Sequence, residues 1–263
     1  MTPVSAISGT SPIVLAQPHS GTWLPDDVRA ALTDDARALI DTDWHVPALY
    51  DGLMPDATIV RANFSRYVID ANRAPDGASL YPGQNTTSLV PLSDFDGRPI
   101  WKVAPDDAEI ARRLDLYHRP YHRALEREIE RVRAGHGFAV LYDCHSIRAQ
   151  IPFLFEGTLP DLNIGTNSGQ SCAPAVERAV AAACARAQGY STVLNGRFKG
   201  GWTTRHYGHP ENGVHAVQME IAQRTYLMSE EPPFALCPEK SGRLREVLAE
   251  VFAAIRATFG EIA

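Results

Sequence analysis

Apolar residues along this chain fall into short continuous runs that alternate with longer stretches of helical periodicity. Short apolar runs are typical of strands buried on both faces of a sheet. We predict strands at 12–17, 57–61, 66–71, 137–143, 151–155 and 214–221, with weaker candidates at 161–165 and 190–195. We predict helices at 26–32, 43–54, 105–134, 173–188 and 239–259. This alternation favours an α/β fold, with a central mixed sheet in a three-layer αβα arrangement.

The longest predicted helix, 105–134, begins with Pro105 and two aspartates, which suit a first helical turn. Its apolar residues recur every three or four positions and so share one face. Pro120 lies inside this pattern. Because proline lacks an N–H and its ring clashes with the preceding turn, we expect the helix to kink or divide there.

The stretch from about 74 to 104 shows neither the strand nor the helix period. It is rich in Gly, Pro, Asp and Ser. A loop of this length in a compact domain usually has a function. We therefore predict a single domain over 1–263, with an excursion at about 74–104 that lies over the active site.

Composition and charge narrow the class of protein. The 263 residues are 44% hydrophobic and carry a formal net charge of −6, without a Lys/Arg-rich run, which argues against nucleic acid as a partner. No apolar segment approaches the roughly 20 residues that span a bilayer, and the N-terminus lacks the pattern of a signal peptide. The four cysteines form no CxxC pair, so we expect free thiols and a cytoplasmic protein.

Two histidines stand just beyond predicted strands. His19 lies in Pro18-His19-Ser20-Gly21 and His145 in Asp143-Cys144-His145-Ser146, each after an apolar run. Ligands of open α/β sheets bind at the carboxyl ends of the strands. A catalytic zinc ion takes imidazole and carboxylate ligands and keeps one position open for water. We therefore predict a metal site of zinc-hydrolase type that includes both histidines.

The third ligand is expected from the acidic segment 41–45. We favour Asp43, with Asp41 and His45 as the alternatives. Zinc suits such a ligand set best, although cobalt, nickel and iron also accept it.

Glu220 lies near the carboxyl end of the predicted strand at 214–221. A carboxylate beside an activated water can accept its proton and deliver it to a leaving nitrogen. Because side chains alternate along a strand, Gln218 and Glu220 should share one face while Met219 points to the other. The competing interpretation of Glu220 is a structural salt bridge.

Several arginines on polar segments indicate a substrate with carboxylates. Arg73 follows another predicted strand and can bind a carboxylate in bidentate fashion, with Asn72 as an additional donor. The glycine-flanked loop at 200–208 carries Arg205 and His206 and could close on a ligand. Further candidates are Arg66 and Arg148.

Other catalytic classes find no support. The chain has no GxSxG elbow, and it has neither a GxGxxG segment after a strand nor a GxxxxGK[ST] loop, so a nucleotide cofactor is not indicated. Cys144 precedes His145, but neighbouring residues of a strand point to opposite faces, which argues against a Cys–His dyad.

Taken in chain order, these motifs resemble the N-formylglutamate amidohydrolase (N-formylglutamate deformylase) family. The matching segments are 18–21, 41–46, 70–73, 80–84, 143–146, 165–167, 199–208 and 213–220, and they extend over most of the chain. The resemblance implies a fold similar to that of the zinc carboxypeptidases (phosphorylase/hydrolase-like), in which helices enclose a mixed sheet.

The resemblance also implies an activity. Members hydrolyse N-formyl-L-glutamate to formate and L-glutamate, cleaving a linear amide C–N bond in histidine degradation, with one divalent metal. By matching position, the implied roles are metal binding by His19, Asp43 and His145, base catalysis by Glu220, and substrate carboxylate binding by Asn72, Arg73 and Arg205. Arg73 or Arg205 would also hold the developing oxyanion. Zinc carboxypeptidases carry a glutamate three residues after the first histidine, where this chain has Thr22, so the acidic ligand must come from farther along.

Two alternatives remain open from the sequence. One is an N-acylamino-acid deacylase or carboxypeptidase that acts on a different acyl group. The other is a non-catalytic protein that binds acidic amino acids, with structural histidines. Whether the chain is a monomer or a homo-oligomer is not indicated.

Overall fold

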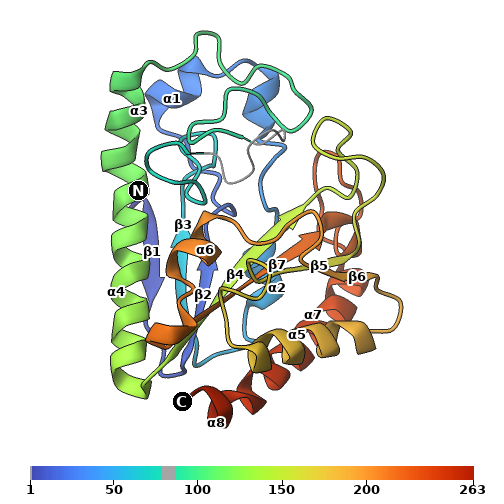
Figure 1. The fold of residues 1–263 in the computed structure, drawn as a ribbon. Helices are drawn as coiled ribbons and strands as arrows, with labels where there is room; N and C mark the ends of the chain where they lie inside the picture. The colour runs from blue at the N-terminus through green and yellow to red at the C-terminus, as the bar shows by residue number, and fades with distance from the viewer. Residues whose placement is uncertain (1, 79–86) are drawn as a thin grey trace.

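The fold, seen in a computed structural model that describes residues 2–78 and 87–263, is built on a central mixed sheet (Figure 1). The motif at 80–84 lies outside the described residues. Among the described residues, the sheet has seven strands in the order β1-β3-β2-β4-β7-β5-β6. The strands are β1 (Val4–Ile7), β2 (Ile13–Gln17), β3 (Thr58–Ala62), β4 (Ala139–Ile147), β5 (Leu162–Gly165), β6 (Thr192–Leu194) and β7 (Val214–Ala222).

Four neighbouring strands set the direction of the sheet. β3, β2, β4 and β7 run parallel, whereas β1 pairs antiparallel with β3, and β5 pairs antiparallel with β7. The carboxyl ends of β2, β4 and β7 therefore meet at one edge of the sheet. In this register His145 on β4 lies opposite Glu220 on β7.

Helices cover both faces of the sheet. They are α1 (Asp26–Ala31), α2 (Val46–Tyr50), α3 (Asp107–Arg113), α4 (Arg119–His136), α5 (Pro174–Arg186), α6 (Trp202–Tyr207), α7 (Pro238–Ala257) and α8 (Phe259–Ile262). Shorter turns are η1 (Asp35–Ala38), η2 (Leu114–His118), η3 (Pro210–Asn212) and η4 (Gln223–Thr225). Figure 1 shows α3 and α4 along one side of the sheet and α5 and α7 along the other. None of the helices in the described part of the chain is long and apolar enough to cross a membrane.

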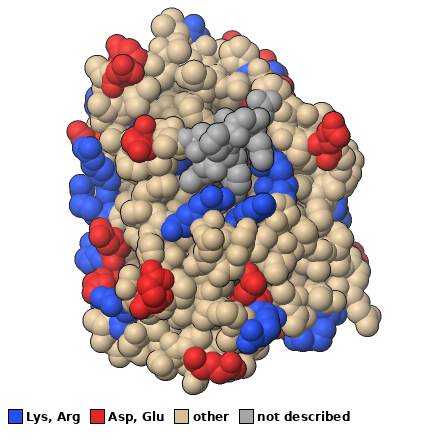
Figure 2. Space-filling model, in the orientation of Figure 1, with Lys and Arg blue, Asp and Glu red and all other residues tan. Residues whose placement is uncertain are grey.

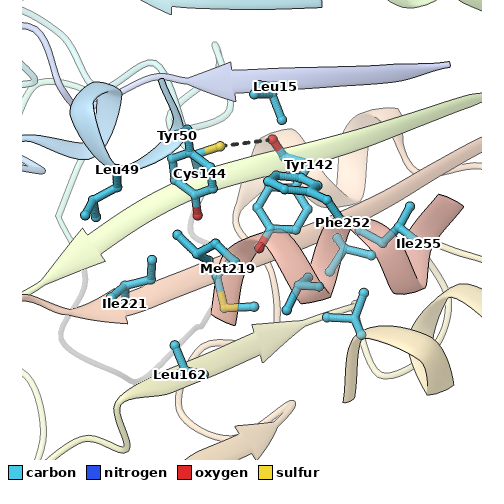
Figure 3. Packing of buried hydrophobic residues seen from close by; sticks show 14 of the residues in the cluster. Leu15, Leu49, Tyr50, Tyr142, Cys144, Leu162, Met219, Ile221, Phe252 and Ile255 are labelled. Carbon is cyan, nitrogen blue, oxygen red and sulfur yellow. Dashed lines mark hydrogen bonds between the residues drawn. The ribbon is translucent and has the colours of Figure 1, made fainter. Parts of the chain in front are cut away.

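The alternation of strand residues divides the core into two layers. On β2, Ile13 and Leu15 join the apolar cluster under α2, α5 and α7, whereas Val14 and Ala16 join the cluster under α4. The first cluster, in Figure 3, contains Cys144. Each fully buried aliphatic or aromatic side chain in these two clusters stabilises the fold by about 1.5–3 kcal/mol. The predicted three-layer arrangement with a mixed sheet is confirmed.

The predicted helix at 105–134 is present and divides before the proline. α3 ends at Arg113, and a π-helical turn, η2, connects it to α4. The N–H of Arg119 bonds the carbonyl of Leu114, five residues back. Pro120 then lies in the first turn of α4, where its missing N–H has no consequence.

Two predicted strands, 66–71 and 151–155, are wrong. Both segments fold as turns, closed by bonds such as those from the Val68 N–H to the Ser65 carbonyl and from the Phe155 N–H to the Ile151 carbonyl. The apolar side chains of 66–71 are buried, and a buried turn has the same composition as a buried strand. In 151–155 only Ile151 is buried, and Phe153 is exposed.

Three other segments also differ from the prediction. The helix expected at 43–54 is only α2, within a segment otherwise formed by turns. β1 pairs on the sheet edge where no strand was expected. The loop predicted at 200–208 contains the short helix α6, whose Thr203 N–H is bonded by the side chain of Asn72. That partner is distant in the chain, so no local pattern indicated the helix.

Candidate active site

Two imidazoles and one carboxylate converge at the carboxyl edge of the sheet. His19 follows β2, His145 lies on β4, and Asp43 precedes α2; all three are buried. One potential ligand atom from each lies within 4.8 Å of the others. Asp43 Oδ2 is 3.1 Å from His145 Nδ1 and 3.9 Å from His19 Nδ1. This is a spacing that one cation between the three groups can bridge.

The outer nitrogen of each imidazole faces a second carboxylate. His19 Nε2 donates to Asp70 Oδ1 at 2.6 Å, and His145 Nε2 is 3.0 Å from Asp143 Oδ1. Such carboxylate–imidazole pairs fix the ring orientation and leave the other ring nitrogen directed at a metal. Sequence reasoning assigned no role to Asp70 or Asp143. For Asp143 a signal existed, because it lies two residues before His145 on the same strand and so on the same face.

The electrostatics of this cluster favour a positive charge between the histidines. Burial disfavours an imidazolium, yet Asp143 and Asp43 raise the pKa of His145 well above its ordinary value. Burial lowers the pKa of His19, and Arg66 acts in the same direction. Buried carboxylates that outnumber the buried cations form an environment that suits a divalent ion.

Glu220 lies beside this cluster with its side chain on the same face of the sheet. Gln218 and Glu220 line the cavity, while Met219 packs into the apolar cluster, in agreement with the expected alternation. Burial, together with the nearby Asp43 carboxylate, raises the pKa of Glu220 to about 8. Gln218 Nε2 donates to Glu220 Oε2 at 3.2 Å, and Gln218 Oε1 accepts from the Gly201 N–H at 2.6 Å.

A cavity of about 260 Å³ opens onto these groups. It is bordered by guanidinium groups of Arg66, Arg73 and Arg197 and by Asn72. Figure 2 shows Lys and Arg side chains gathered near the middle of the viewed face. Apolar side chains complete the wall: Phe95, Ile147, Leu154 and Phe198. In the described part of the 74–104 segment, residues on both sides of the undescribed stretch line the cavity, among them Ala78 and Thr87.

The alternatives for the third metal ligand face elsewhere. His45 Nε2 donates to the Phe234 carbonyl at 2.8 Å. Asp41 Oδ2 accepts from the Tyr67 hydroxyl at 2.8 Å and from the Phe95 N–H at 3.0 Å. Asp43 is therefore the acidic residue of this segment that reaches the two imidazoles.

The predicted substrate residues separate into two groups. Asn72 and Arg73 line the cavity, and Asn72 Nδ2 is 3.1 Å from His145 Nε2. Arg205 and His206 are not among the lining residues of the described chain: Arg205 Nε donates to the Gly200 carbonyl, and the exposed His206 ring stacks on Trp202.

The other arginines of the polar loops also divide between the cavity and the surface. Arg148 bonds Asp96 at 2.9 Å and does not line the cavity, whereas Arg66 does. Arg197 also lines it, although the sequence reasoning did not select it. No sequence pattern distinguishes Arg197 from the other loop arginines of this chain.

Comparison with known proteins identifies the family. The family model for N-formylglutamate amidohydrolase matches residues 11–227. The N-formylglutamate deformylase of Pseudomonas aeruginosa is 48% identical over 252 residues, covering 95% of this chain and 94% of that protein. That of Pseudomonas putida is 47% identical with the same coverage. The crystal structure of N-formylglutamate amidohydrolase from Ralstonia eutropha JMP134 superposes with a TM-score of 0.83 at 26% identity, covering 99% of this chain and 100% of that one. This chain belongs to the N-formylglutamate amidohydrolase family.

Proposed function

We propose that this protein hydrolyses N-formyl-L-glutamate to formate and L-glutamate as a metal-dependent amidohydrolase. The observation that carries the proposal is the meeting of His19, Asp43, His145 and Glu220 at one end of a cavity with cationic walls. It is supported by 48% identity, over nearly the whole chain, to a deformylase of that specificity.

The donor set fits a divalent metal, for which we propose zinc. Two imidazole nitrogens and one carboxylate oxygen are a set that catalytic zinc uses, and Asp70 and Asp143 would orient the imidazoles. A cation held there would polarise the formyl oxygen and lower the pKa of a water molecule from about 15.7 toward about 7.

Glu220 would act as the base and then as the acid. Its buried carboxylate lies across from His145 and shares the cavity with the histidines. It would accept the proton of the attacking water and pass it to the departing amine nitrogen, so that glutamate leaves as a neutral amine. Gln218, which bonds Glu220 and the backbone of Gly201, would hold this carboxylate in place.

Cations of the cavity wall would bind the substrate carboxylates. Arg73 and Asn72 line the cavity, with Asn72 next to His145, and they would orient the substrate through hydrogen bonds to its carboxylates. A guanidinium beside the developing oxyanion would contribute about 3 kcal/mol per donor by comparison with other oxyanion holes. Arg205 and His206 do not line the cavity, so their binding of the substrate carboxylates stays a prediction from the sequence.

A formate-release assay tests the proposal. The purified protein, with and without a chelator, is given N-formyl-, N-acetyl- and N-succinyl-L-glutamate in parallel. We expect turnover of the formyl compound that is lost with the chelator and restored best by zinc, tested against cobalt, nickel and iron. Equal turnover of the acetyl compound would instead identify a general deacylase, and lack of any turnover would favour a binding protein.

Glu220→Gln is the sharpest variant for the mechanism. We expect it to retain the metal and to lose about 10²- to 10⁴-fold in turnover, the usual contribution of a general base. The control is the metal content of the variant, measured by elemental analysis. Near wild-type turnover would contradict the assigned role. We also propose that the protein acts in histidine degradation and is located in the cytoplasm.

A further inference from the structure

Two buried histidines outside the metal cluster contact the segment that carries Asp70, Asn72 and Arg73. We call residues 70–73 the active-site strap. His118 ends the π-helical turn η2, and His122 lies one turn later in α4, so both face the same side of the helix. Their exposed fractions are 2% and 8%. π-helical turns are frequent at functional sites.

Each of these imidazoles binds a carbonyl of the strap. His118 Nε2 is 2.9 Å from the Arg73 carbonyl, and His122 Nε2 is 2.8 Å from the Ala71 carbonyl. A carbonyl only accepts, so both rings carry a proton on Nε2 and donate it. His122 Nδ1, 3.0 Å from the Tyr207 hydroxyl, is then the acceptor. In the neutral ring of His122, each nitrogen therefore has a hydrogen-bond partner.

The strap depends on these donors because it pairs with none of the strands in the described part of the chain. Its residues fold as turns, with the Asp70 N–H bonded to the Leu89 carbonyl and the Asn72 N–H to the Asp70 side chain. Buried carbonyls without a partner are costly, by about 1–3 kcal/mol each. The two imidazoles satisfy alternate carbonyls, and the Asn72 side chain between them points toward His145.

The same histidines support Asn72 through α6. The Trp202 ring packs against His122 with ring centroids 4.6 Å apart, at 85°. The next residue, Thr203, donates its N–H to Asn72 Oδ1 at 2.8 Å. The backbone before Asn72 and the far end of its side chain are therefore held by one packed cluster, His118, His122 and Trp202.

We propose that His118 and His122 are positioning residues of the active site, which fix the direction of the Asn72 and Arg73 side chains by holding the Ala71 and Arg73 carbonyls. This inference rests on the proposed function for its kinetic test. Burial lowers the pKa of both histidines, which agrees with neutral donors.

Leucine and glutamine variants separate positioning from folding. Leucine removes the donor, whereas the amide nitrogen of glutamine reaches the place of Nε2. For His118→Leu we expect KM for N-formyl-L-glutamate to rise about tenfold with kcat changed less than about threefold, the equivalent of one lost hydrogen bond at the Arg73 carbonyl. His122 bonds the Ala71 carbonyl, which lies between Asp70 and Asn72 in the chain. For His122→Leu we therefore expect kcat to fall about tenfold. Both glutamine variants should stay within about twofold of the wild type.

His215→Leu is the matched control. His215 is also buried, at 3%, and its Nδ1 accepts from the Ala173 N–H, away from the strap. We expect this variant to lose thermal stability without a change in KM or kcat. Folded His118→Leu and His122→Leu proteins with unchanged kinetics would overturn the proposal. An equal loss in the leucine and glutamine variants would overturn it as well.

The ring tautomers give a test that needs no substrate. Long-range ¹⁵N–¹H spectra of the wild-type protein, assigned with the variants, should show a proton on Nε2 alone for His118 and His122. A proton on Nδ1, or on both nitrogens at neutral pH, would overturn the proposal. If the wild type releases no formate, the proposed function fails, and the tautomers still decide whether the two histidines hold the strap.

Discussion

Gly201→Ala is predicted to disable the site by displacing one amide group. Gly201 precedes α6 with φ −76°, a backbone conformation open to any residue, so the effect of the new methyl group is purely steric. A Cβ at this position would lie 2.2 Å from Asn72 Nδ2 and 2.6 Å from Asn72 Oδ1. Because carbon and nitrogen atoms pack at about 3.5 Å, the amide must retreat by roughly 1 Å.

The displaced amide cannot keep its present contacts. Asn72 Nδ2 is now 3.1 Å from His145 Nε2, and Asn72 Oδ1 is 2.8 Å from the Thr203 nitrogen. A shift of this size breaks the hydrogen bond from the Thr203 N–H and moves the amide away from the His145 ring. Overpacking of this kind costs about 1–3 kcal/mol of stability. Misplacement of a positioning group by about 1 Å can cost up to about 10²-fold in rate.

We therefore expect kcat/KM for formate release to fall between about tenfold and about hundredfold, with a melting temperature lower by several degrees. Gly242→Ala is the matched control. Gly242 is exposed in α7, and a methyl group there would meet nothing within 4 Å, so this variant should gain up to about 1 kcal/mol and keep its activity. Wild-type kcat/KM in a folded Gly201→Ala protein would refute the reasoning that Asn72 must stay in place.

The remaining predictions concern the metal, the pH dependence and the core. Asp70→Asn should weaken metal binding about 10- to 100-fold, measured by chelator competition, because the His19 ring loses its charged partner; unchanged affinity would contradict this. Burial lowers the pKa of His118 and of His122, so the unfolded chain binds protons first below about pH 6.5. Stability from these neutral rings is complete above that pH and is lost below it, at up to about 1.4 kcal/mol per pH unit for each ring. Urea unfolding at several pH values should show that the free energy of unfolding changes less with pH in His122→Gln than in the wild type. The same pH dependence in both proteins would contradict the neutral state of His122. Cys144→Ala should cost about 1 kcal/mol in unfolding experiments and leave kcat/KM unchanged, because burial raises the pKa of this core thiol; a large loss of turnover would revive a catalytic cysteine.

The sequence alone determined the layers and the strand-end chemistry. Continuous apolar runs at β2 and at the start of β4 required strands buried on both faces, and helical periods elsewhere in the chain required helices on both sides. In parallel strands the carboxyl ends meet at one edge, so His19, His145 and Glu220 could be expected together before any distance was known. Alternation along β7 separated Glu220 from Met219 for the same reason.

Only the tertiary structure decided which of several similar side chains faces the site. Asp41, Asp43 and His45 lie within five residues, and the turn that presents Asp43 is set by contacts from distant segments. The strap at 70–73 was expected at the end of a strand but folds as a turn, and its Ala71 and Arg73 carbonyls are bonded by imidazoles about fifty residues away in the chain. Local patterns record which residues prefer burial or a helix. They contain no information on donors and acceptors that meet across the fold, and those long-range hydrogen bonds fix the direction of the functional groups.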